Sequence, residues 1–454
     1  MIYKSSNGNI RIVLAGDVML SRRLTPYDEP RYLELVELLR GADLSFANLE
    51  TTVRNGGEGL PNFTQGTPMS TPPALLEDLK WMGFDLLGCA NNHATDYGTG
   101  GVQATISHLT DAGIPFAGIG NSLAEARSPG YCDTAAGRVA VTAATSFFRI
   151  GNQAADQRPD ASGRPGINPL RFSRQYEVDD AGFAALRRLS AELGLDQEHI
   201  RHKAQFYSER ETGHEGDDHL SFMGAAFRRG NGFSVTTRVN REDAEANLRW
   251  IREARRQADW VIFSFHSHEF GNAGAMTAAT DVDMEEPAEF ATSFAREAIE
   301  AGADIVAGHG PHLTLGLEVY KGKPILYSLG NFIFQNDTIE RFPAEAYQRF
   351  GLSFEATPAD FLDTRTNNGT KGFPASAEFW QSYAAECVFE QRKLAGLRLL
   401  PLDLGYGTSR AERGRPILAS GDAARFILER IQRLSRPFGT EITIEGDIGY
   451  VRLN

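Results

Sequence analysis

The sequence predicts an α/β fold built in layers, on the strength of three observations. Short apolar runs recur along the chain, each run stops abruptly at polar or glycine residues, and amphipathic stretches separate the runs. Short apolar runs are typical of buried strands, and strands that alternate with helices indicate layers of sheet and helix. A chain of 454 residues exceeds one minimal core, so we expect a catalytic domain that carries large insertions.

Five apolar runs end next to side chains that bind metals or transfer protons. They are Ile10–Ala15 before Asp17, Leu44–Ala47 before Glu50, Phe84–Ala90 before Asn92, Trp260–Phe265 before His266, and Ile305–Ala307 before His309. Ligands of an open α/β sheet bind beyond the carboxyl ends of its strands. We therefore expect these five side chains to meet around one cation.

The spacers include two clear helices, Arg241–Gln257 and Thr292–Ala301, in which apolar residues alternate with charges. The alternation of strand-like and helix-like segments stops between residues 146 and 240. We interpret this segment as an insertion over the active-site face. Residues 337–454 are expected to form a C-terminal extension that ends in a hairpin. The prediction is one catalytic domain, residues 1–454, with these two additions.

Composition excludes several classes of function. The net charge of −13 argues against nonspecific binding to nucleic acid or to an anionic membrane. The three cysteines, Cys89, Cys132 and Cys387, contain no CxxC pair and favour a reducing compartment. The N-terminus lacks the pattern of a secretory signal, and no stretch approaches 18 consecutive apolar residues. We expect a cytoplasmic protein with no nucleic-acid or membrane partner.

The polar strand ends lie in segments that resemble a known family. The chain is similar to the CapA, or poly-γ-glutamate capsule-synthesis (PGA_cap), family of the calcineurin-like metallophosphoesterase superfamily. The matching segments are residues 14–22, 42–53, 83–101, 259–269 and 302–334. The resemblance implies a metallophosphoesterase-like β-sandwich flanked by helices, a divalent metal cofactor, and a small-molecule or peptide-like substrate.

The resemblance also implies a ligand set. Glu50, Asn92, His266 and His309 would bind one firm metal, and their nitrogen and oxygen donors suit Mn, Zn, Fe or Mg. The chain departs from the phosphoesterase pattern at Met19, where that pattern has a histidine. It also departs in its closing motif, which is one residue longer.

These departures predict a second metal site that is weak or absent. Asp17 and His312 are then expected to act as an acid/base pair, or as ligands of the weak site together with His268. The resemblance implies that His93 acts on a leaving group. Asp96 either orients His93 or caps the helix that follows.

Three arginines between the expected strands, Arg158, Arg164 and Arg171, are candidates for contacting an anionic substrate group. The metal pattern favours a hydrolase that activates water to cleave an amide, peptide-like or ester bond. A phosphoesterase rests on superfamily analogy alone.

Two other classes stay open. An epimerase or lyase would use Asp17 and His312 on opposite faces of a substrate carbon, and a polymer-synthesis accessory protein would need no catalysis. The sequence contains no GxGxxG nucleotide-binding loop and no GxSxG nucleophile.

Overall fold

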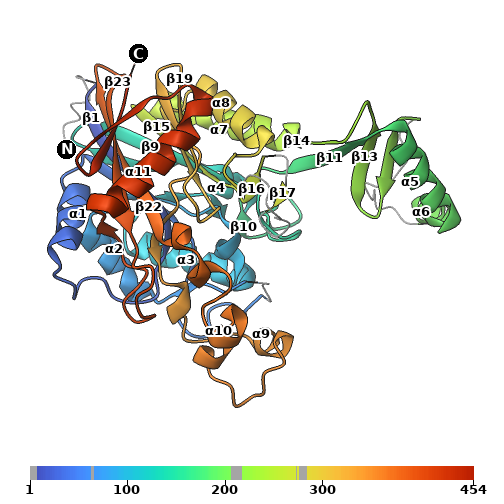
Figure 1. Cartoon of the computed structure of the whole chain (residues 1–454), viewed down its shortest axis with the longest axis horizontal. Helices are drawn as coiled ribbons and strands as arrows, with labels where there is room; N and C mark the ends of the chain where they lie inside the picture. Colours follow the sequence, from blue (N-terminus) through green and yellow to red (C-terminus); the bar gives the residue numbers. More distant parts are fainter. Residues whose placement is uncertain (1–7, 63–65, 206–216, 272–273, 276–283, 454) are drawn as a thin grey trace. The chain divides into compact units, whose positions relative to one another are not determined.

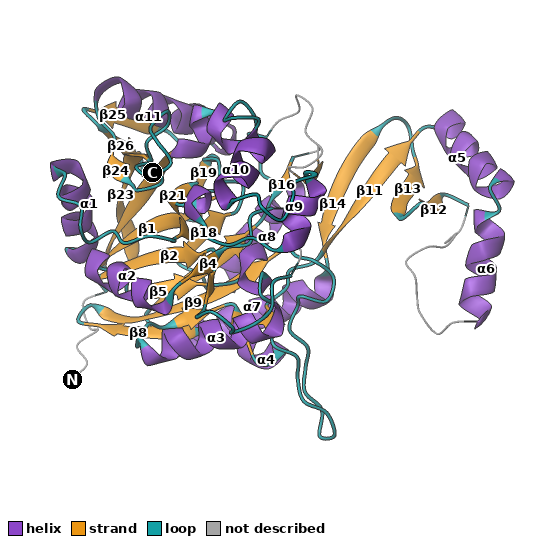
Figure 2. Ribbon diagram, turned by 90° about the horizontal axis from the view of Figure 1, so that it is seen from below, coloured by secondary structure: helices purple, strands orange, loops and turns teal. Residues whose placement is uncertain are grey.

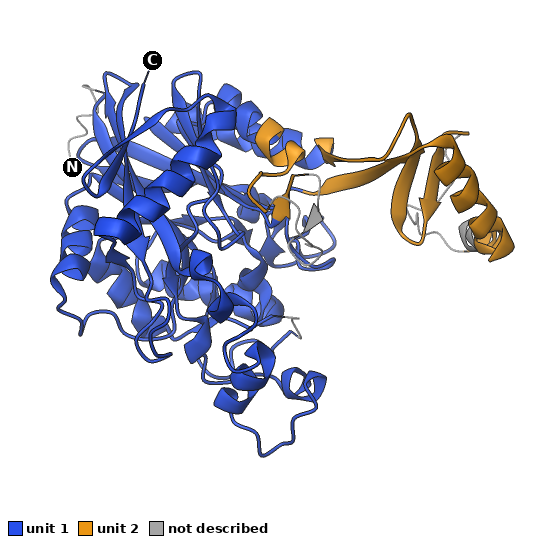
Figure 3. Ribbon diagram, viewed as in Figure 1, with its two compact units in different colours: residues 1–170, 242–268, 294–454 blue, residues 171–241, 269–293 orange. Residues whose placement is uncertain are grey.

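The computed structural model describes residues 8–62, 66–205, 217–271, 274–275 and 284–453. The chain forms two compact units, shown in Figure 3. Unit 1 comprises residues 1–170, 242–268 and 294–454, and unit 2 comprises residues 171–241 and 269–293.

Unit 1 contains a ten-stranded sheet with the order β25-β26-β23-β22-β1-β2-β5-β6, in which β21 also pairs with β1 and β24 with β23. Its strands are β1 (Ile10–Met19), β2 (Leu44–Leu49), β5 (Leu86–Gly88), β6 (Phe116–Ala117), β21 (Asn331–Phe334), β22 (Gln381–Glu390), β23 (Lys393–Asp403), β24 (Ile417–Leu418), β25 (Ile442–Glu445) and β26 (Ile448–Val451). Strand β1 runs parallel to β2, and β2 runs parallel to β5. Their carboxyl ends therefore share one edge.

A second, six-stranded sheet in unit 1 has the order β19-β20-β18-β15-β9-β8. Figure 1 labels β9, β15 and β19 of this sheet. Its strands are β8 (Gly130–Thr134), β9 (Gly137–Thr145), β15 (Trp260–His266), β18 (Ile305–His309), β19 (Leu317–Tyr320) and β20 (Lys323–Leu326). Strand β15 is parallel to both β9 and β18, and His266 pairs with His309 in register. Both histidines therefore lie at the same end of this sheet.

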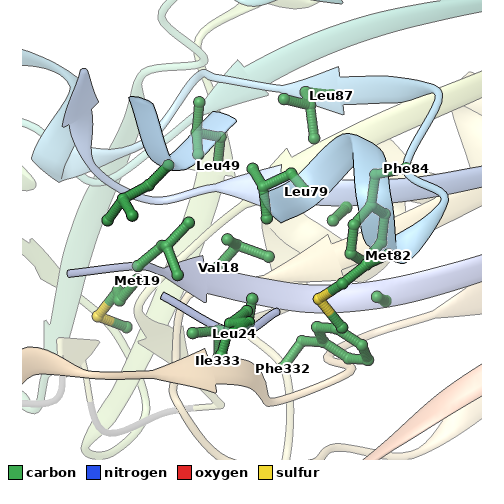
Figure 4. Close-up of a cluster of buried hydrophobic side chains, with 14 of the residues drawn as sticks. Val18, Met19, Leu24, Leu49, Leu79, Met82, Phe84, Leu87, Phe332 and Ile333 are labelled. Carbon is green, nitrogen blue, oxygen red and sulfur yellow. The ribbon is translucent and has the colours of Figure 1, made fainter. Parts of the chain in front are cut away.

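The two sheets pack against each other through one apolar core. Leu14 and Phe46 of the larger sheet share this core with Val141 and Ile262 of the smaller one. Side chains alternate along a strand, so Ala47 and Leu49 of β2 lie on the opposite face, in a second core. Figure 4 shows part of that second core, where Leu49 lies near Leu79. This arrangement confirms the predicted layered α/β fold.

Helices cover the outer faces of both sheets (Figure 2). Helices α1 (Pro30–Arg40), α2 (Leu76–Met82) and α3 (Gly98–Asp111) contribute to the outer core of the larger sheet. Helix α7 (Arg241–Gln257) buries Leu248 and Ile251, and α8 (Glu289–Ala301) packs Phe294 on Phe263 with their ring centroids 5.5 Å apart. The remaining elements outside the two large sheets are β3 (Thr52–Val53), β4 (Ser70–Thr71), β7 (Ile119–Gly120), β10 (Gly166–Ile167), β16 (Glu269–Phe270), β17 (Gly274–Ala275), α4 (Leu123–Arg127), α9 (Ala344–Arg349), α10 (Pro358–Thr366) and α11 (Gly421–Ser435).

Strand β1 continues past the expected end at Ala15 and includes Asp17. Its register shifts between Leu14 and Asp17, and Asp17 then pairs with Asn331 of β21. A Cβ atom on Gly16 would lie 1.8 Å from the carbonyl oxygen of Gly330, so only glycine fits this close approach. The bulge sets the direction of the Asp17 side chain.

The C-terminal part of the chain completes the larger sheet. Strand β22 pairs antiparallel with β1 and with β23, so residues within the expected extension lie beside the first strand. Strand β22 is buried along most of its length, and β23 is buried along its second half, so both are part of the sandwich. Strands β25 and β26 form the antiparallel hairpin near the end of the chain.

Unit 2 has its own four-stranded sheet, with the order β12-β13-β11-β14. Around this sheet lie β11 (Phe172–Val178), α5 (Asp180–Glu192), α6 (Leu195–Gln205), β12 (His219–Phe222), β13 (Ala225–Arg229) and β14 (Ser234–Val239), with a small core of Val178, Phe183 and Leu220. Strands β16 and β17 also belong to unit 2. The expected insertion, residues 146–240, overlaps this unit, but residues 146–170 belong to unit 1. Its placement over the active-site face stays a prediction. Across the part of the chain that the structure describes, no helix has the length and apolar character needed to cross a membrane.

Trp260 provides a test of the core between the sheets. The side chain is 1% exposed, its ring centroid lies 4.9 Å from that of Phe389, and its indole Nε1 has no hydrogen-bond partner among the described residues. Trp260→Ala is expected to cost about 3–5 kcal/mol of unfolding free energy because it leaves a cavity. Trp260→Phe should cost less than half as much, since it keeps a ring and removes an unpaired donor. Urea denaturation followed by circular dichroism would measure both, and equal losses would contradict this account.

Candidate metal centre

Polar side chains from both sheets converge at the shared strand ends of unit 1. The Nε2 atom of His266 lies 2.8 Å from Oδ1 of Asn92 and 2.9 Å from Nε2 of His268. The same nitrogen is 3.6 Å from Oε1 of Glu50. These four donors come from β15, from two residues beyond its end, and from the segments that follow β2 and β5. Nitrogen and oxygen donors gathered in this way are typical of sites that bind a divalent cation.

Asp17 and His312 lie on another side of Glu50. Nδ1 of His312 is 3.9 Å from Oδ2 of Asp17 and 3.9 Å from Oε2 of Glu50. Oδ1 of Asp17 is 3.8 Å from Nδ1 of His266. Glu50 therefore stands between two sets of donors.

Two groups of buried residues share Glu50. Within each group, the potential ligand atoms all lie within 4.8 Å of one another. One group is Asp17, Glu50 and His266, and the other is Glu50, His268 and His312. The structure thus brings Asp17, His312 and His268 together with Glu50 and His266, whereas the sequence assigned Asp17 and His312 mainly to acid/base work. His309 reaches the same sheet end but belongs to neither group.

The burial of these groups fits a divalent metal. Both carboxylate oxygens of Glu50 and both ring nitrogens of His309 are buried, and they have no hydrogen-bond partner among the residues that the structure describes. Burial, followed by the nearby charge of Asp17, raises the pKa of Glu50 well above its ordinary value, and burial raises that of Asp17 to about 7. Burial lowers the pKa of His266. A cation would compensate the two carboxylates and use the neutral imidazoles as ligands.

Asn48 is a site residue that sequence reasoning missed. Its Nδ2 atom donates to Oδ1 of Asp17 at 2.7 Å and lies 3.3 Å from Nδ1 of His266. Its Oδ1 accepts a hydrogen bond from Asn91, which also donates to the carbonyl of Leu49. Asn48 follows the apolar run of β2 directly, so its place at a strand end was the available signal. This amide fixes the orientation of two potential ligands.

His93 forms a buried pair with Asp96 beside the ligand groups. Nδ1 of His93 lies 2.6 Å from Oδ2 of Asp96, and the same oxygen accepts from the backbone N–H of Met69 at 2.7 Å. Nε2 of His93 is 3.8 Å from Oε1 of Glu50. Helix α3 has Tyr97 at its N-cap position. Asp96 therefore orients His93, and its alternative role as the cap of α3 is wrong.

His312 is held by Asn331 and by aromatic rings. The amide of Asn331 donates to the carbonyls of His312 and Phe379, so its Oδ1 faces Nδ1 of His312 at 2.9 Å. This assigns the proton to Nδ1 and leaves the lone pair on Nε2. Phe334 and Phe373 lie with ring centroids 5.6 Å and 5.2 Å from that of His312. On the other side of the site, Phe147 stacks on His268 at 4.1 Å.

The three arginines predicted to contact substrate are not among the residues that build this site. Arg158 is exposed and pairs with Asp160 at 3.1 Å. Arg164 is also exposed and donates to the carbonyl of Gln153. Arg171 belongs to unit 2. Local sequence could not distinguish these arginines from others whose positions are set by the fold.

The sequence of the chain is similar to several known bacterial proteins. The family model described as "Bacterial capsule synthesis protein PGA_cap" matches residues 11–336. The chain is 37% identical to the uncharacterized protein y4sH of Sinorhizobium fredii, over 97% of this chain and 93% of that protein. It is 26% identical to the PGA biosynthesis protein CapA of Bacillus subtilis, over 76% and 70% of the two chains. It is 23% identical to a probable polyglutamine synthesis accessory protein of Mycobacterium tuberculosis, over 96% and 94%.

Proposed function

The chain belongs to the bacterial capsule synthesis protein PGA_cap family, within the metallophosphoesterase-like superfamily, and on that premise we propose that it is a metal-dependent hydrolase. Its substrate is an amide, a peptide-like molecule or an ester. The observation that carries the proposal is the position of Glu50, which is shared by two buried ligand groups and faces the oriented His93. Two relatives are named for PGA and polyglutamine synthesis, which supports a peptide-like substrate.

Each part of the site has a role in such a reaction. Glu50, Asn92, His266 and His309 would hold a cation, together with Asp17, His268 and His312 on the other side of Glu50. A divalent cation held there would supply Lewis acidity that polarises the scissile bond and acidifies the attacking water. Asp96 keeps Nδ1 of His93 occupied, so that Nε2 can exchange a proton with the leaving group. Phe147 and Phe373 shield the histidines from water.

A second candidate, an epimerase, is favoured by the pair Asp17 and His312. Nδ1 of His312 lies 3.9 Å from Oδ2 of Asp17, so the two side chains are neighbours, and the base on His312 would be its Nε2. Two bases on opposite faces of a carbon would each approach it to about 3 Å, so the pair would have to separate by about 2 Å. Hydrolysis needs no such separation and ranks first for that reason.

An isotope experiment distinguishes the candidates. Purified protein with bound metal is incubated with α-linked and γ-linked glutamyl peptides, in ¹⁸O-labelled water or in deuterated water. A hydrolase places ¹⁸O in the product carboxylate, and an epimerase places deuterium on the substrate carbon without cleavage. Mass spectrometry reads both labels. Protein that purifies without stoichiometric metal and acts on none of these peptides would instead support an accessory role in polymer synthesis.

His93→Gln tests the proton-transfer role. The variant is expected to retain its metal content and to lose about 10²–10⁴-fold in hydrolytic rate, because positioned acid/base groups contribute that much. Asp96→Asn should fall between the wild type and His93→Gln, since it leaves the ring in place but without its charged partner. Elemental analysis and rate measurement on the same samples separate the two effects. Loss of metal from His93→Gln would reassign this histidine to the ligands.

We also place the protein in a reducing compartment, in line with the cytoplasm. Cys89, Cys132 and Cys387 are free thiols, and Cys89 and Cys387 are buried. Burial raises the pKa of both thiols far above the ordinary value, which makes them unreactive core residues.

A further inference from the structure

Strands β9 and β15 place two ring side chains beside each other just beyond their ends. In the parallel register of these strands, Thr145 pairs with His266. Phe147 and His268 each lie two residues further along the chain, and their rings stack with centroids 4.1 Å apart and planes 13° from parallel. The hydroxyl of Thr145 donates to the carbonyl of Phe147 and accepts from its N–H, both at 3.2 Å. The strand register and this stack therefore hold the His268 ring in place.

The ring nitrogens of His268 have few protein partners. The residue is 3% exposed, and its Nε2 lies 2.9 Å from Nε2 of His266. Its Nδ1 is buried and has no hydrogen-bond partner in the part of the chain that the structure describes. Buried polar side chains in folded proteins are nearly always hydrogen-bonded. An imidazole buried in this way is available to bind a ligand from outside the chain.

His268 lies in one ligand group with Glu50 and His312, whose potential ligand atoms are all within 4.8 Å of one another. Asp17 borders this group, since its Oδ2 lies 3.9 Å from Nδ1 of His312. Nδ1 of His312 is occupied by Asn331 at 2.9 Å, so the ring offers its Nε2. Asp17, Glu50, His268 and His312 together supply two carboxylates and two imidazoles, which are enough donors for one divalent metal ion.

The other side of Glu50 has donors of its own. Nε2 of His266 lies 2.8 Å from Oδ1 of Asn92, and His266 pairs in register with His309. Both ring nitrogens of His309 are buried and have no hydrogen-bond partner among the described residues. Each side therefore has four donor residues, and Glu50 is the residue that they share.

Met19 explains why the sequence predicted a second site that is weak or absent. The superfamily pattern has a histidine where this chain has Met19. The Met19 side chain is 2% exposed and lies in the outer apolar core, part of which is drawn in Figure 4. His268 comes from the end of a different strand and brings a nitrogen donor to Glu50 and His312. The donor that is lacking at one strand end is thus present at another.

We propose that His268 is a ligand of a second divalent cation, held by Asp17, Glu50, His268 and His312. Imidazole nitrogens favour zinc, iron and related ions over magnesium, so this cation belongs to the transition-metal class. Phe147 is a positioning residue, because its ring holds that of His268. The role of the cation in the reaction rests on the proposed function, whereas the number of bound ions does not.

Counting bound zinc in the full-length protein tests the second cation. Chelator-treated protein is dialysed with Zn²⁺, and elemental analysis gives the zinc bound per chain. The wild type is expected to hold two ions and His268→Phe to hold one, because phenylalanine keeps a ring to stack on Phe147 but has no nitrogen donor. His219→Ala is the matched control and should hold two, since His219 is exposed on β12.

Competition with a chromophoric chelator measures how tightly the second ion is held. His268→Phe should weaken its binding more than about 100-fold, because even outer partners of metal ligands contribute 10–100-fold. Phe147→Leu should weaken it several-fold, whereas Phe147→Tyr keeps the ring and should bind like the wild type. At about a thousandfold excess, Mg²⁺ should displace neither Zn²⁺ ion. Displacement by Mg²⁺ would overturn the assignment to a transition metal.

Two results would overturn the role of His268: one zinc ion in the wild type, or two in His268→Phe. If circular dichroism shows that His268→Phe fails to fold, His268→Leu is used with the same expectation. Incorporation of ¹⁸O is measured on the same preparations. Two bound ions without ¹⁸O incorporation would reject the hydrolase and keep the second cation. Incorporation by a wild type that holds one ion would keep the hydrolase and reject the second cation.

Discussion

His266→Ala is expected to lose stoichiometric metal, with affinity for a divalent cation falling more than about 100-fold, because even outer partners of metal ligands contribute 10–100-fold. His266 is fully buried and contacts Asn92 and His268, while Glu50 and Asp17 lie within 4 Å of its ring nitrogens. Its ring therefore lies among donors of both ligand groups. Elemental analysis and competitive titration with a chromophoric chelator measure the loss.

The matched control for this variant is His108→Ala. His108 lies on α3, away from the strand ends, and pairs with Glu58 at 2.8 Å. Removal of the His108 side chain should therefore leave the metal content unchanged. Full metal occupancy in His266→Ala would mean that the convergence seen in the structure does not bind a cation. Loss of metal in both variants would point to unfolding, which circular dichroism would detect.

Glu50→Gln is expected to keep or raise the unfolding free energy of the metal-free protein and to remove most of the stabilisation that metal binding adds. Both oxygens of Glu50 are buried without hydrogen-bond partners, and its charged form is disfavoured by burial and by Asp17. A neutral amide removes that cost, so metal-free Glu50→Gln should be as stable as the wild type or more stable. With free metal at about 100 times its dissociation constant, the wild type should gain about 2.7 kcal/mol, and the variant should lose most of this gain.

Thermal unfolding with a chelator and with excess metal measures this difference. Glu318→Gln is the control, because Glu318 is also buried but already has partners in Arg296 and Tyr327. It should destabilise the protein equally in both conditions and keep the metal-dependent gain. A Glu50→Gln protein that is stabilised by metal as strongly as the wild type would remove Glu50 from the ligands.

Part of the metal centre could be identified from the sequence, because several of its residues each follow an apolar run. Burial of a strand requires apolar residues, and a polar residue at its end marks where the chain meets the edge of the sheet. Asp17, Glu50, Asn92, His266 and His309 all carried this signal. Asn48 carried it as well and was overlooked, because amides at strand ends are usually read as turn residues.

The grouping of these residues could not be predicted, because it depends on backbone geometry that local pattern does not encode. The bulge before Asp17 requires the close approach of Gly16 to Gly330, a residue more than 300 positions away. His312 adopts a left-handed backbone conformation, with φ of 58°, at the end of the longer closing motif. These two features place Asp17 and His312 beside Glu50. The departures from the superfamily pattern had predicted that they act as an acid/base pair or bind a weak second metal together with His268.

By itself, the sequence determined the layered α/β fold, the family, and the set of strand ends that supply the donors, since all three follow from periodicity and from motifs that are local in the chain. The tertiary structure decided which donors share Glu50 and where the C-terminal strands enter the larger sheet. Those outcomes depend on distances between residues far apart in the chain. Such distances are fixed only when the two sheets pack and bury the groups between them.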